Sequence, residues 1–399
     1  MGHRSSEGRS GVRHSGCFLR CRLSFLRSGI PFHASPPTVD EKKFKEQCDS
    51  CFPSPCQDRH ACCLAIDELD FPMPTGIISI GSHVPDHVVG NDQIAEWAGV
   101  SEEWIHERTG IRERRYASAG TATSDLAVHA VRQIFSERDG AAELIDALIL
   151  ATCTPDVPQP ATAAIVQHKL GLRAMPAFDV NAVCSGFLYG MAVADGLRSA
   201  SPDTEHVLVV GADMFSTIMD RSDRSTVSLF GDGAGAVLLG PVPEGYGLLA
   251  MRTLSDGALH HLVGVPAGGT ALPLDRAALQ SGQNFLKMDG RAIRQYVQTT
   301  LPKIVDQVLD DAGLGLGGID RFIFHQANPR LLESFADMTG IDRKRMPLTA
   351  PQLGNTAGAS IPVTLCAADR DRPLERGENL LLASIGGGMN AAAALLRWY

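Results

Sequence analysis

Strand-sized apolar runs alternate with helix-sized segments along most of this chain. The runs 147–151 and 380–384 have the length and composition of buried strands, whereas 161–170 and 291–312 have those of helices. Strands that alternate with helices predict an α/β protein with a sheet rich in parallel pairs and helices on its faces. At 399 residues, the chain is long enough for one large core or two smaller ones.

The expected elements form two similar successions, in residues 73–241 and 245–399, which indicates an internal duplication. In the first half we expect strands at 76–80, 147–151, 177–180, 206–211 and 234–239. We expect Ser101 to cap one of the helices there, which are placed at 92–98, 101–104, 123–136, 161–170 and 184–199. In the second half we expect strands at 248–254, 321–325, 380–384 and 391–397, and helices at 291–312, 331–338 and 359–368.

Residues 1–72 differ from the rest of the chain because they show no sustained strand or helix periodicity. Residues 1–34 hold six arginines against one acidic residue, a composition that resembles an organellar transit peptide. Seven of the ten cysteines precede residue 73, but their spacing is too irregular for the ligand pairs of a typical zinc site. We expect a disordered leader or a non-native extension, with Met73 as the functional start; a transit peptide and a metal site are the alternatives.

Composition narrows the class of function. The net charge of −9 argues against a general nucleic-acid-binding surface. No apolar stretch approaches the roughly 20 residues that a membrane-spanning helix needs, so we expect neither a nucleic acid nor a membrane as partner. Beyond residue 73 the cysteines are Cys153, Cys184 and Cys366, which fits a reducing cytoplasmic compartment, with organellar import as the lesser alternative.

Three polar residues have the types and contexts of an acyl-transfer site. Cys184 follows an apolar, strand-like segment and precedes Ser-Gly and a helix of small residues. This context predicts a cysteine at a helix N-terminus, where a thiolate is favoured. His325 lies in His-Gln-Ala-Asn, and Asn355 lies in Gly-Asn-Thr-Ala-Gly-Ala-Ser. A cysteine, a histidine and an asparagine that converge in space indicate thioester chemistry. Taken singly, each also has a structural explanation: a buried cysteine, a satisfied histidine and a turn asparagine.

Six motifs in a fixed order give the sequence a family resemblance. They are Trp104 with Arg-Thr-Gly-Ile-Arg-Glu-Arg-Arg at 108–115, Cys-Ser-Gly-Phe from Cys184, Gly-Asp-Gly-Ala-Gly-Ala at 231–236, His-Gln-Ala-Asn from His325, the run around Asn355, and Gly-Gly-Gly at 386–388. From about residue 76 to its end, the chain resembles β-ketoacyl-acyl carrier protein synthase III, of the thiolase superfamily. The resemblance implies an α/β, thiolase-like five-layered α-β-α-β-α fold from two similar halves, and a homodimer.

The resemblance also implies a decarboxylative Claisen condensation that initiates fatty acid or polyketide biosynthesis. Cys184 would take an acyl group from acyl-CoA, either acetyl or a longer or branched group. His325 and Asn355 would bind the thioester carbonyl of malonyl-acyl carrier protein and stabilise the enolate that decarboxylation leaves. Backbone N–H groups of Cys184 and Gly387 would bind the oxygen of the acyl-Cys thioester, because a glycine turn lets the backbone approach a ligand closely.

Substrate-binding residues follow from the same resemblance. Trp104, Arg108 and Arg224 would hold the nucleotide end of CoA, and Arg330 would dock the acidic carrier protein. The CoA thioester is then a substrate, and we expect no cofactor and no metal; the glycines at 231–236 lack the Lys-Ser/Thr ending of a phosphate loop. Gln159 falls where some family members have a phenylalanine that closes the acyl pocket, so a longer or branched starter is a hypothesis.

Three other classes of protein are alternatives. An acyltransferase of the same fold would pass the acyl group to a hydroxyl or an amine without decarboxylation. A papain-like cysteine protease also orders Cys, His and Asn, but its Cys-Gly-Ser/Ala-Cys-Trp/Tyr signature is absent from the sequence. A non-catalytic partner subunit would typically lack the active cysteine, whereas Cys184 is present.

Overall fold

The computed structural model describes residues 73–399, and the leader predicted at 1–72 lies outside them. The strands of this part are β1 (Thr75–His83), β2 (Val88–Gly90), β3 (Glu113–Arg115), β4 (Ala147–Ala151), β5 (Ala177–Val180), β6 (Val207–Met214), β7 (Asp232–Pro241), β8 (Gly247–Ser255), β9 (Val263–Gly264), β10 (Lys287–Met288), β11 (Arg321–Phe324), β12 (Asn379–Gly386) and β13 (Asn390–Arg397). The α-helices are α4 (Asn91–Ala98), α5 (Glu102–Thr109), α6 (Thr123–Glu137), α7 (Ala141–Leu144), α8 (Thr162–Leu170), α9 (Gly186–Ala200), α10 (Arg224–Val227), α11 (Arg276–Gln280), α12 (Gly290–Asp311), α13 (Pro329–Thr339), α14 (Ala350–Leu353) and α15 (Ser360–Asp371).

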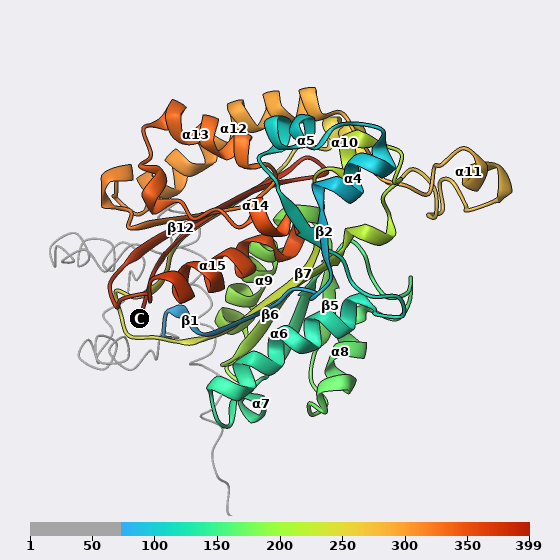
Figure 1. Ribbon diagram of the computed structural model, residues 1–399. Helices are drawn as coiled ribbons and strands as arrows, with labels where there is room; N and C mark the ends of the chain where they lie inside the picture. Colours follow the sequence, from blue (N-terminus) through green and yellow to red (C-terminus); the bar gives the residue numbers. More distant parts are fainter. Residues whose placement is uncertain (1–72) are drawn as a thin grey trace, which may run out of the picture. The chain divides into compact units, whose positions relative to one another are not determined.

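Two mixed sheets form the framework (Figure 1). The first has the order β1-β7-β6-β4-β5 and the second the order β11-β12-β13-β8. Helices α9 and α15 lie between the sheets, because both helices share one apolar core with the facing strands of both sheets. Helices α6 and α8 pack on the outer face of the first sheet, and α12 and α13 pack on the outer face of the second. The predicted five-layered α-β-α-β-α fold is therefore confirmed.

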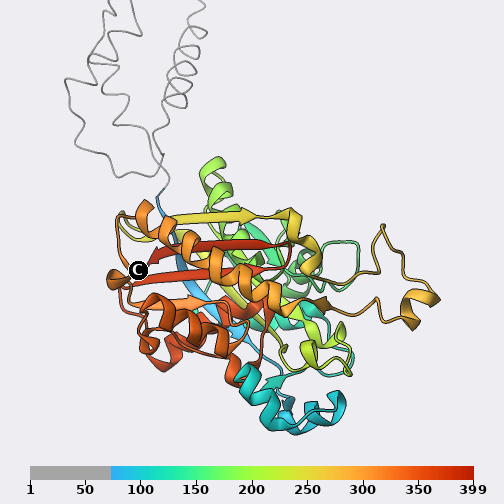
Figure 2. The ribbon, with the colours of Figure 1, turned by 90° about the horizontal axis from the view of Figure 1, so that it is seen from above.

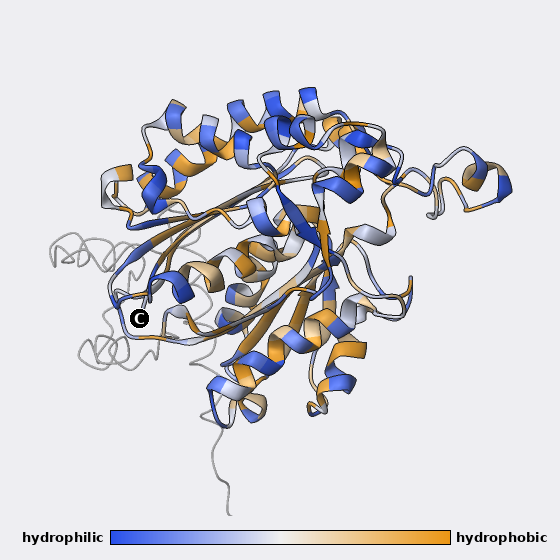
Figure 3. Ribbon diagram, viewed as in Figure 1, coloured by the Kyte–Doolittle hydropathy of each residue, from blue (hydrophilic) through white to orange (hydrophobic). Residues whose placement is uncertain are grey.

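Side chains of the strands alternate between these cores, as the two-residue period of a strand requires. In β4, Leu148 and Leu150 face α6 and α8, whereas Ile149 faces the central layer. In β12, Leu381 faces α12 and Leu382 faces the central layer. Figure 3 shows the same division, with apolar strands and with hydrophilic residues on the outer faces of α12 and α13. A strand buried on both faces is a continuous apolar run, which is why β4 and β12 can be recognised from the sequence.

The prediction of a sheet rich in parallel pairs holds for only three of the seven strand pairs in the two large sheets. Strand β4 pairs in parallel with β5 and β6, and β11 pairs in parallel with β12. In contrast, the pairs β1–β7, β6–β7, β12–β13 and β13–β8 are antiparallel. Strands β12 and β13 follow one another across a short turn, and a short turn joins only antiparallel strands. The alternation of apolar runs with helices carries no information about such direct connections.

The order and direction of the strands repeat between the two sheets. The series β1-β7-β6-β4 and β8-β13-β12-β11 each contain two antiparallel pairs followed by one parallel pair. Strand β5 is an addition at the edge of the first sheet. The connection between the sheets runs from Pro241 to Gly247, where the sequence analysis placed the boundary between the halves. The topology therefore shows the two similar halves that the succession of elements indicated.

The observed bounds differ from the predicted ones mainly at helix starts and in one arm. Ser101 caps α5 as predicted, since its Oγ accepts the N–H of Trp104 at 3.1 Å. The helix predicted at 184–199 begins instead at Gly186, because Cys184 lies in a 3-10 turn, η1 (Val183–Ser185). The segment 256–289 was not predicted, and its middle part, which contains α11, projects from the rest of the described residues (Figures 1 and 2). No helix among the described residues is long and apolar enough to cross a membrane.

Candidate active site

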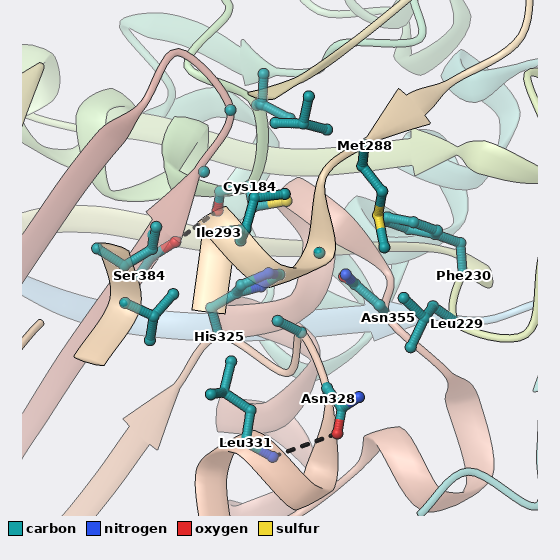
Figure 4. Close-up of a pocket in the computed structure, with 18 of the residues that line it drawn as sticks. Cys184, Leu229, Phe230, Met288, Ile293, His325, Asn328, Leu331, Asn355 and Ser384 are labelled. Carbon is teal, nitrogen blue, oxygen red and sulfur yellow. Dashed lines mark hydrogen bonds between the residues drawn. The ribbon is translucent and has the colours of Figure 1, made fainter. Parts of the chain in front are cut away.

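One cavity of about 490 Å³ is lined by the three polar residues that the sequence analysis singled out. Cys184 comes from the first half of the chain, and His325 and Asn355 come from the second. Figure 4 shows the side chains of these three residues around the same space. Gly386 and Gly387 also line the cavity. The structure therefore brings together the residues to which the resemblance assigned catalysis.

Cys184 is presented by a tight turn before α9. Val183, the first residue of η1, has a φ of 50°, a left-handed conformation that costs energy in a β-branched residue. The turn places the cysteine at the N-terminal end of α9, whose macrodipole favours a thiolate. Burial of the side chain and the nearby carboxylate of Asp213 instead raise the pKa of Cys184. The buried setting thus favours the thiol, against the thiolate expected from the sequence.

His325 follows the end of β11 and is held there by its backbone. Its N–H donates to the carbonyl of Ala383 in β12 at 2.9 Å, so the pairing continues one residue past the strand. The ring is buried, and burial lowers the pKa of His325 to about 3. The ring is therefore neutral near pH 7 and carries one N–H donor. Its Nδ1 has no hydrogen-bond partner among the described residues, so the protein leaves the choice of tautomer open.

Asn355 is fixed in place by hydrogen bonds. Its Oδ1 accepts the N–H of Ala357 at 2.9 Å, which leaves the amide nitrogen for the cavity. Its own N–H donates to the carbonyl of Leu229 at 2.8 Å, and its carbonyl accepts the N–H of Gly231 at 3.0 Å. In Figure 4 the amide nitrogen points toward the His325 ring. Two N–H donors can thus converge on one oxygen atom, as an oxyanion site requires.

The glycine turn at 386–388 packs directly against the nucleophile. A Cβ at Gly386 would lie 2.9 Å from the backbone nitrogen of Cys184 and 2.8 Å from the carbonyl oxygen of Ala182. A Cβ at Gly387 would lie 2.9 Å from Cγ1 of Val263. Side chains at these positions would collide with backbone or with a core residue, so glycine is required for the approach. The turn thereby brings the backbone of Gly387 and that of Cys184 to one edge of the cavity.

Arginine side chains line the mouth of the cavity. Arg108 of α5 and Arg330 of α13 do so, as does Arg294 of α12, which the sequence analysis did not single out. Arg330 also pairs with Glu333, at 3.0 Å. A helical arginine gives no sequence signal of binding, because its ordinary place is a solvated helix surface. The three guanidinium groups offer positive charge and paired N–H donors to a phosphate.

Trp104 and Arg224 form a pair that does not line the cavity itself. The Arg224 guanidinium lies 5.4 Å from the centre of the Trp104 ring. Trp104 packs against the apolar cluster that contains Cys184, and it lies one helical turn before Arg108 on α5. Arg224 is exposed at the start of α10. The residues predicted to hold the nucleotide therefore lie next to the cavity mouth, in part on one helix.

Gln159 does not line the cavity of the single chain. Its side chain is exposed, in the segment before α8, so the predicted role in the acyl pocket gains no support from its position. The cavity wall near Cys184 is formed instead by residues that include Cys153, Phe215 and Phe230. The two phenylalanine rings are stacked with centroids 4.5 Å apart.

Asp213, at the end of β6, is a positioning candidate that the sequence did not reveal. Its buried carboxylate accepts the N–H of Cys153 at 2.8 Å and the N–H of Gly358 at 2.8 Å. Two threonine hydroxyl groups donate to the same carboxylate. Asp213 therefore joins the cavity wall near Cys184 to the turn that follows Asn355. A single acid at the end of an apolar strand forms no motif, so no sequence pattern points to it.

Replacing Asp213 by asparagine is expected to move the pH midpoint of Cys184 alkylation to lower pH. The carboxylate raises the pKa of Cys184, and an amide removes that charge while it keeps an acceptor oxygen. Burial raises the pKa of Asp213 itself, and the donors around it oppose that shift. Iodoacetamide rates over a pH series give the midpoint, with Asp311→Asn, at an exposed ion pair, as control. An unchanged midpoint would show that Asp213 carries no charge near the nucleophile.

Two turns of the same form contact each other at the site. One is η1, and the other is η6 (Ala357–Ala359), each a 3-10 turn directly before a helix of the central layer. Their first residues, Val183 and Ala357, have φ values of 50° and 49°. The second residue is Cys184 in η1 and Gly358 in η6. The duplication seen in the sheets therefore extends to the backbone of the catalytic turns.

Comparison with known proteins gives consistent matches over the described residues. The family model for 3-oxoacyl-[acyl-carrier-protein] synthase III matches residues 178–257, and the model for its C-terminal part matches residues 309–398. Acetoacetyl CoA synthase NphT7 of Streptomyces sp. (strain CL190) is 43% identical over 81% of this chain and 98% of its own length. Beta-ketoacyl-[acyl-carrier-protein] synthase III of Rhodospirillum centenum is 40% identical over 82% of this chain and 100% of its own length.

Solved structures match the same part of the chain. The 3-oxoacyl-(acyl carrier protein) synthase III FabH of Pseudomonas aeruginosa PAO1 has a TM-score of 0.74 and 36% identity, and the match covers 82% of this chain and 98% of that one. The priming β-ketosynthase of the R1128 polyketide biosynthetic pathway has a TM-score of 0.74 and 28% identity, over 82% of this chain and 97% of that one. The chain belongs to the 3-oxoacyl-[acyl-carrier-protein] synthase III family.

Proposed function

We propose that the protein catalyses a decarboxylative condensation between an acyl-CoA and a malonyl thioester. The products are a 3-oxoacyl thioester, CoA and carbon dioxide, and the step initiates fatty acid or polyketide biosynthesis. One observation carries the proposal: Cys184, His325 and Asn355 line a single cavity, with Gly387 at its edge. A nucleophile beside two sets of N–H donors suits a reaction that develops negative charge on two thioester oxygens in turn.

The first step transfers the acyl group to Cys184. The sulfur attacks the carbonyl carbon of the acyl-CoA, the bond from that carbon to the CoA sulfur breaks, and the thiol proton ends on CoA. Because burial favours the thiol, the proton leaves as the new bond forms, and no proton is released overall. Backbone N–H groups of Cys184 and Gly387 stabilise the oxyanion of this step.

The second step forms the carbon–carbon bond. The malonyl thioester places its carbonyl oxygen between the His325 ring and the Asn355 amide, and loss of carbon dioxide leaves an enolate there. A neutral imidazole donates one N–H and Asn355 donates another, so the developing charge is stabilised in a site shielded from water. The enolate carbon attacks the acyl-Cys carbonyl, the carbon–sulfur bond breaks, and the Cys184 thiolate takes up a proton from solvent.

The carrier of the malonyl group has two candidates. An acyl carrier protein is one, with Arg330 as its docking residue. CoA is the other, because its phosphates can bind the arginines that line the mouth of the cavity. The relative named acetoacetyl CoA synthase is in line with the second candidate.

Mass spectrometry after incubation with a series of acyl-CoAs tests the proposed function. A thioester adduct on Cys184 is expected, and its yield across the series identifies the preferred starter. Malonyl-CoA or malonyl-acyl carrier protein, added next, should consume the adduct and release carbon dioxide, and their relative rates identify the carrier. No adduct with any acyl-CoA would refute the proposal. Transfer to a hydroxyl or an amine without carbon dioxide would identify the acyltransferase alternative instead.

A homodimer and a cytoplasmic location are parts of the same proposal. Strand β5 pairs only with β4 among the described strands, and its residues are half-buried whereas those of β4 are buried. An edge strand of this kind can pair with a second copy of the chain. The cysteines of the described residues are free, as in a reducing compartment. Sedimentation of the purified protein would reveal the dimer.

A further inference from the structure

Arg114 of β3 is a charged residue in the interior of the protein. Its side chain is fully buried, and no carboxylate among the described residues forms an ion pair with it. The guanidinium group donates instead to neutral oxygen atoms: the carbonyl of Ser228 at 2.8 Å, the side-chain oxygen of Asn91 at 2.9 Å and, less closely, the carbonyl of Val89 at 3.4 Å. Burial lowers the pKa of Arg114 to about 10, so the group is still charged near pH 7. Burying a charge without a counterion costs free energy, so Arg114 is a poor choice for stability alone.

One contact of Arg114 leads directly to Asn355. Ser228, whose carbonyl accepts the guanidinium N–H, directly precedes Leu229. The carbonyl of Leu229 accepts the backbone N–H of Asn355 at 2.8 Å, and the carbonyl of Asn355 accepts the N–H of Gly231 at 3.0 Å. Figure 4 shows the Leu229 side chain beside that of Asn355 at the cavity. The segment that Arg114 binds is thus the one that holds the backbone of Asn355 by two hydrogen bonds.

The stem of Arg114 packs against the same two stretches of backbone. A Cβ at Gly231 would lie 3.2 Å from the Cβ of Arg114, and a Cβ at Gly354, directly before the site asparagine, would lie 3.0 Å from it. Side chains rarely approach so closely, so the two glycines make room for the stem. The backbone N–H of Arg112 also donates to the carbonyl of Pro351 at 2.9 Å. The chain at β3 therefore supports the turn that carries the asparagine by a side chain and by a backbone hydrogen bond.

We propose that Arg114 is a positioning residue for Asn355. By binding the carbonyl of Ser228 and packing on both glycines, it fixes the place from which the Asn355 amide nitrogen donates to the thioester oxygen of the second substrate. The proposal rests on the proposed condensation and deepens it, because it assigns control of the decarboxylation step to a residue that does not line the cavity. In the proposed mechanism, acylation uses the backbone N–H groups of Cys184 and Gly387, so that step does not depend on Arg114.

A matched pair of substitutions tests the proposal. Arg114→Met keeps an unbranched stem and removes the charge and the donors, and Arg198→Met does the same at a buried arginine of α9 that does not line the cavity. The Arg198 guanidinium also donates to neutral oxygen atoms, the carbonyl of Glu205 and the hydroxyl of Thr75. Arg114→Met should slow carbon dioxide release on acyl-loaded protein by about tenfold or more, because a small displacement of a catalytic group has an effect of this size. The rate of Cys184 acylation should keep the wild-type value. Arg198→Met should leave the ratio of the two rates unchanged, since a general loss of stability affects both steps alike.

A double variant separates positioning from a general effect on the site. In an Asn355→Ala background, Arg114→Met should slow carbon dioxide release little further, because the group that it positions is gone. Arg114→Lys keeps the charge and a long stem but not the paired donors, so its rate should lie between those of the wild type and Arg114→Met. If Arg114→Met does not fold, the lysine variant takes its place in both comparisons. Fold-changes that multiply in the double variant would overturn the proposal.

Hydrogen exchange tests the same contact without any condensation. The backbone N–H of Asn355 should exchange faster in Arg114→Met, because the segment that accepts it is no longer held, and should keep the wild-type rate in Arg198→Met. The N–H of Cys153, which donates to a carboxylate elsewhere in the cavity wall, should keep its rate in both variants. The proposed function is decided separately, by the Cys184 adduct of the wild type. An unchanged exchange rate at Asn355 would overturn the inference, and so would an unchanged ratio of the two reaction rates.

Discussion

Replacing Cys184 by alanine is expected to remove the acyl adduct and to slow condensation by about 10⁴-fold or more. Without the sulfur, no covalent bond holds the acyl group next to the enolate. The enolate would then have to attack the acyl-CoA directly, and the site does not position that reaction. Mass spectrometry measures the adduct, and carbon dioxide release measures condensation. The control is Cys366→Ala, which removes a free buried cysteine of α15 that does not line the cavity.

The presence or absence of the acyl adduct in each cysteine variant identifies the nucleophile. Cys153 shares the cavity with Cys184, but its thiol donates a hydrogen bond to the carboxylate of Asp213 at 3.4 Å, which favours the protonated form and holds the thiol away from a substrate. Cys153→Ala should therefore keep the adduct that Cys184→Ala loses. An acyl group that remains on the Cys184→Ala protein, at Cys153 or elsewhere, would contradict the assignment.

Replacing Asn355 by alanine is expected to slow condensation by about 10²- to 10³-fold, the usual cost of one lost oxyanion donor. Acylation of Cys184 should continue, because in the proposed mechanism the acyl-Cys oxygen binds backbone N–H groups of Cys184 and Gly387 rather than Asn355. The adduct should therefore accumulate in the presence of the malonyl thioester. Pre-loading the protein with an acyl group and following carbon dioxide release separates the two steps.

Asn355→Asp is the matched variant for this experiment. Its carboxylate can still accept the N–H of Ala357, so the turn keeps its hydrogen bond. The N–H₂ donor is replaced by a negative charge that repels the enolate, so decarboxylation should be slower than in Asn355→Ala. An aspartate variant as active as the wild type would mean that the amide nitrogen of Asn355 donates to no substrate oxygen.

The sequence predicts the layers and the reacting residues because both leave local patterns. A strand buried on two faces is an apolar run, and Cys184, His325 and Asn355 each lie in a short motif with glycine or small residues. Strand direction leaves no such pattern, so the antiparallel pairs of both sheets were missed. Asp213 and Arg294 were missed for a related reason: each lies at the site only because the fold brings distant parts of the sequence together, and each looks like an ordinary residue of its own element.

Burial explains why the protonation state of a predicted site residue can differ from the one expected from the sequence. The helix N-terminus argues for a thiolate at Cys184, but the sequence does not show how deeply the side chain lies or that Asp213 is near it. The same holds for His325, whose pKa of about 3 follows from burial rather than from any neighbour in the sequence. The sequence can therefore identify a candidate catalytic side chain without giving its protonation state, which depends on burial.

The matching turns η1 and η6 show one backbone conformation at two places in the site. In η6, the N–H of Gly358 donates to a carboxylate of the protein itself, that of Asp213. In η1, Cys184 holds the equivalent position and lines the cavity. In the proposed mechanism, the turn that binds a buried carboxyl group of the protein in one half thus binds the oxyanion of the substrate in the other. The same backbone conformation therefore makes a structural contact in η6 and presents the nucleophile in η1.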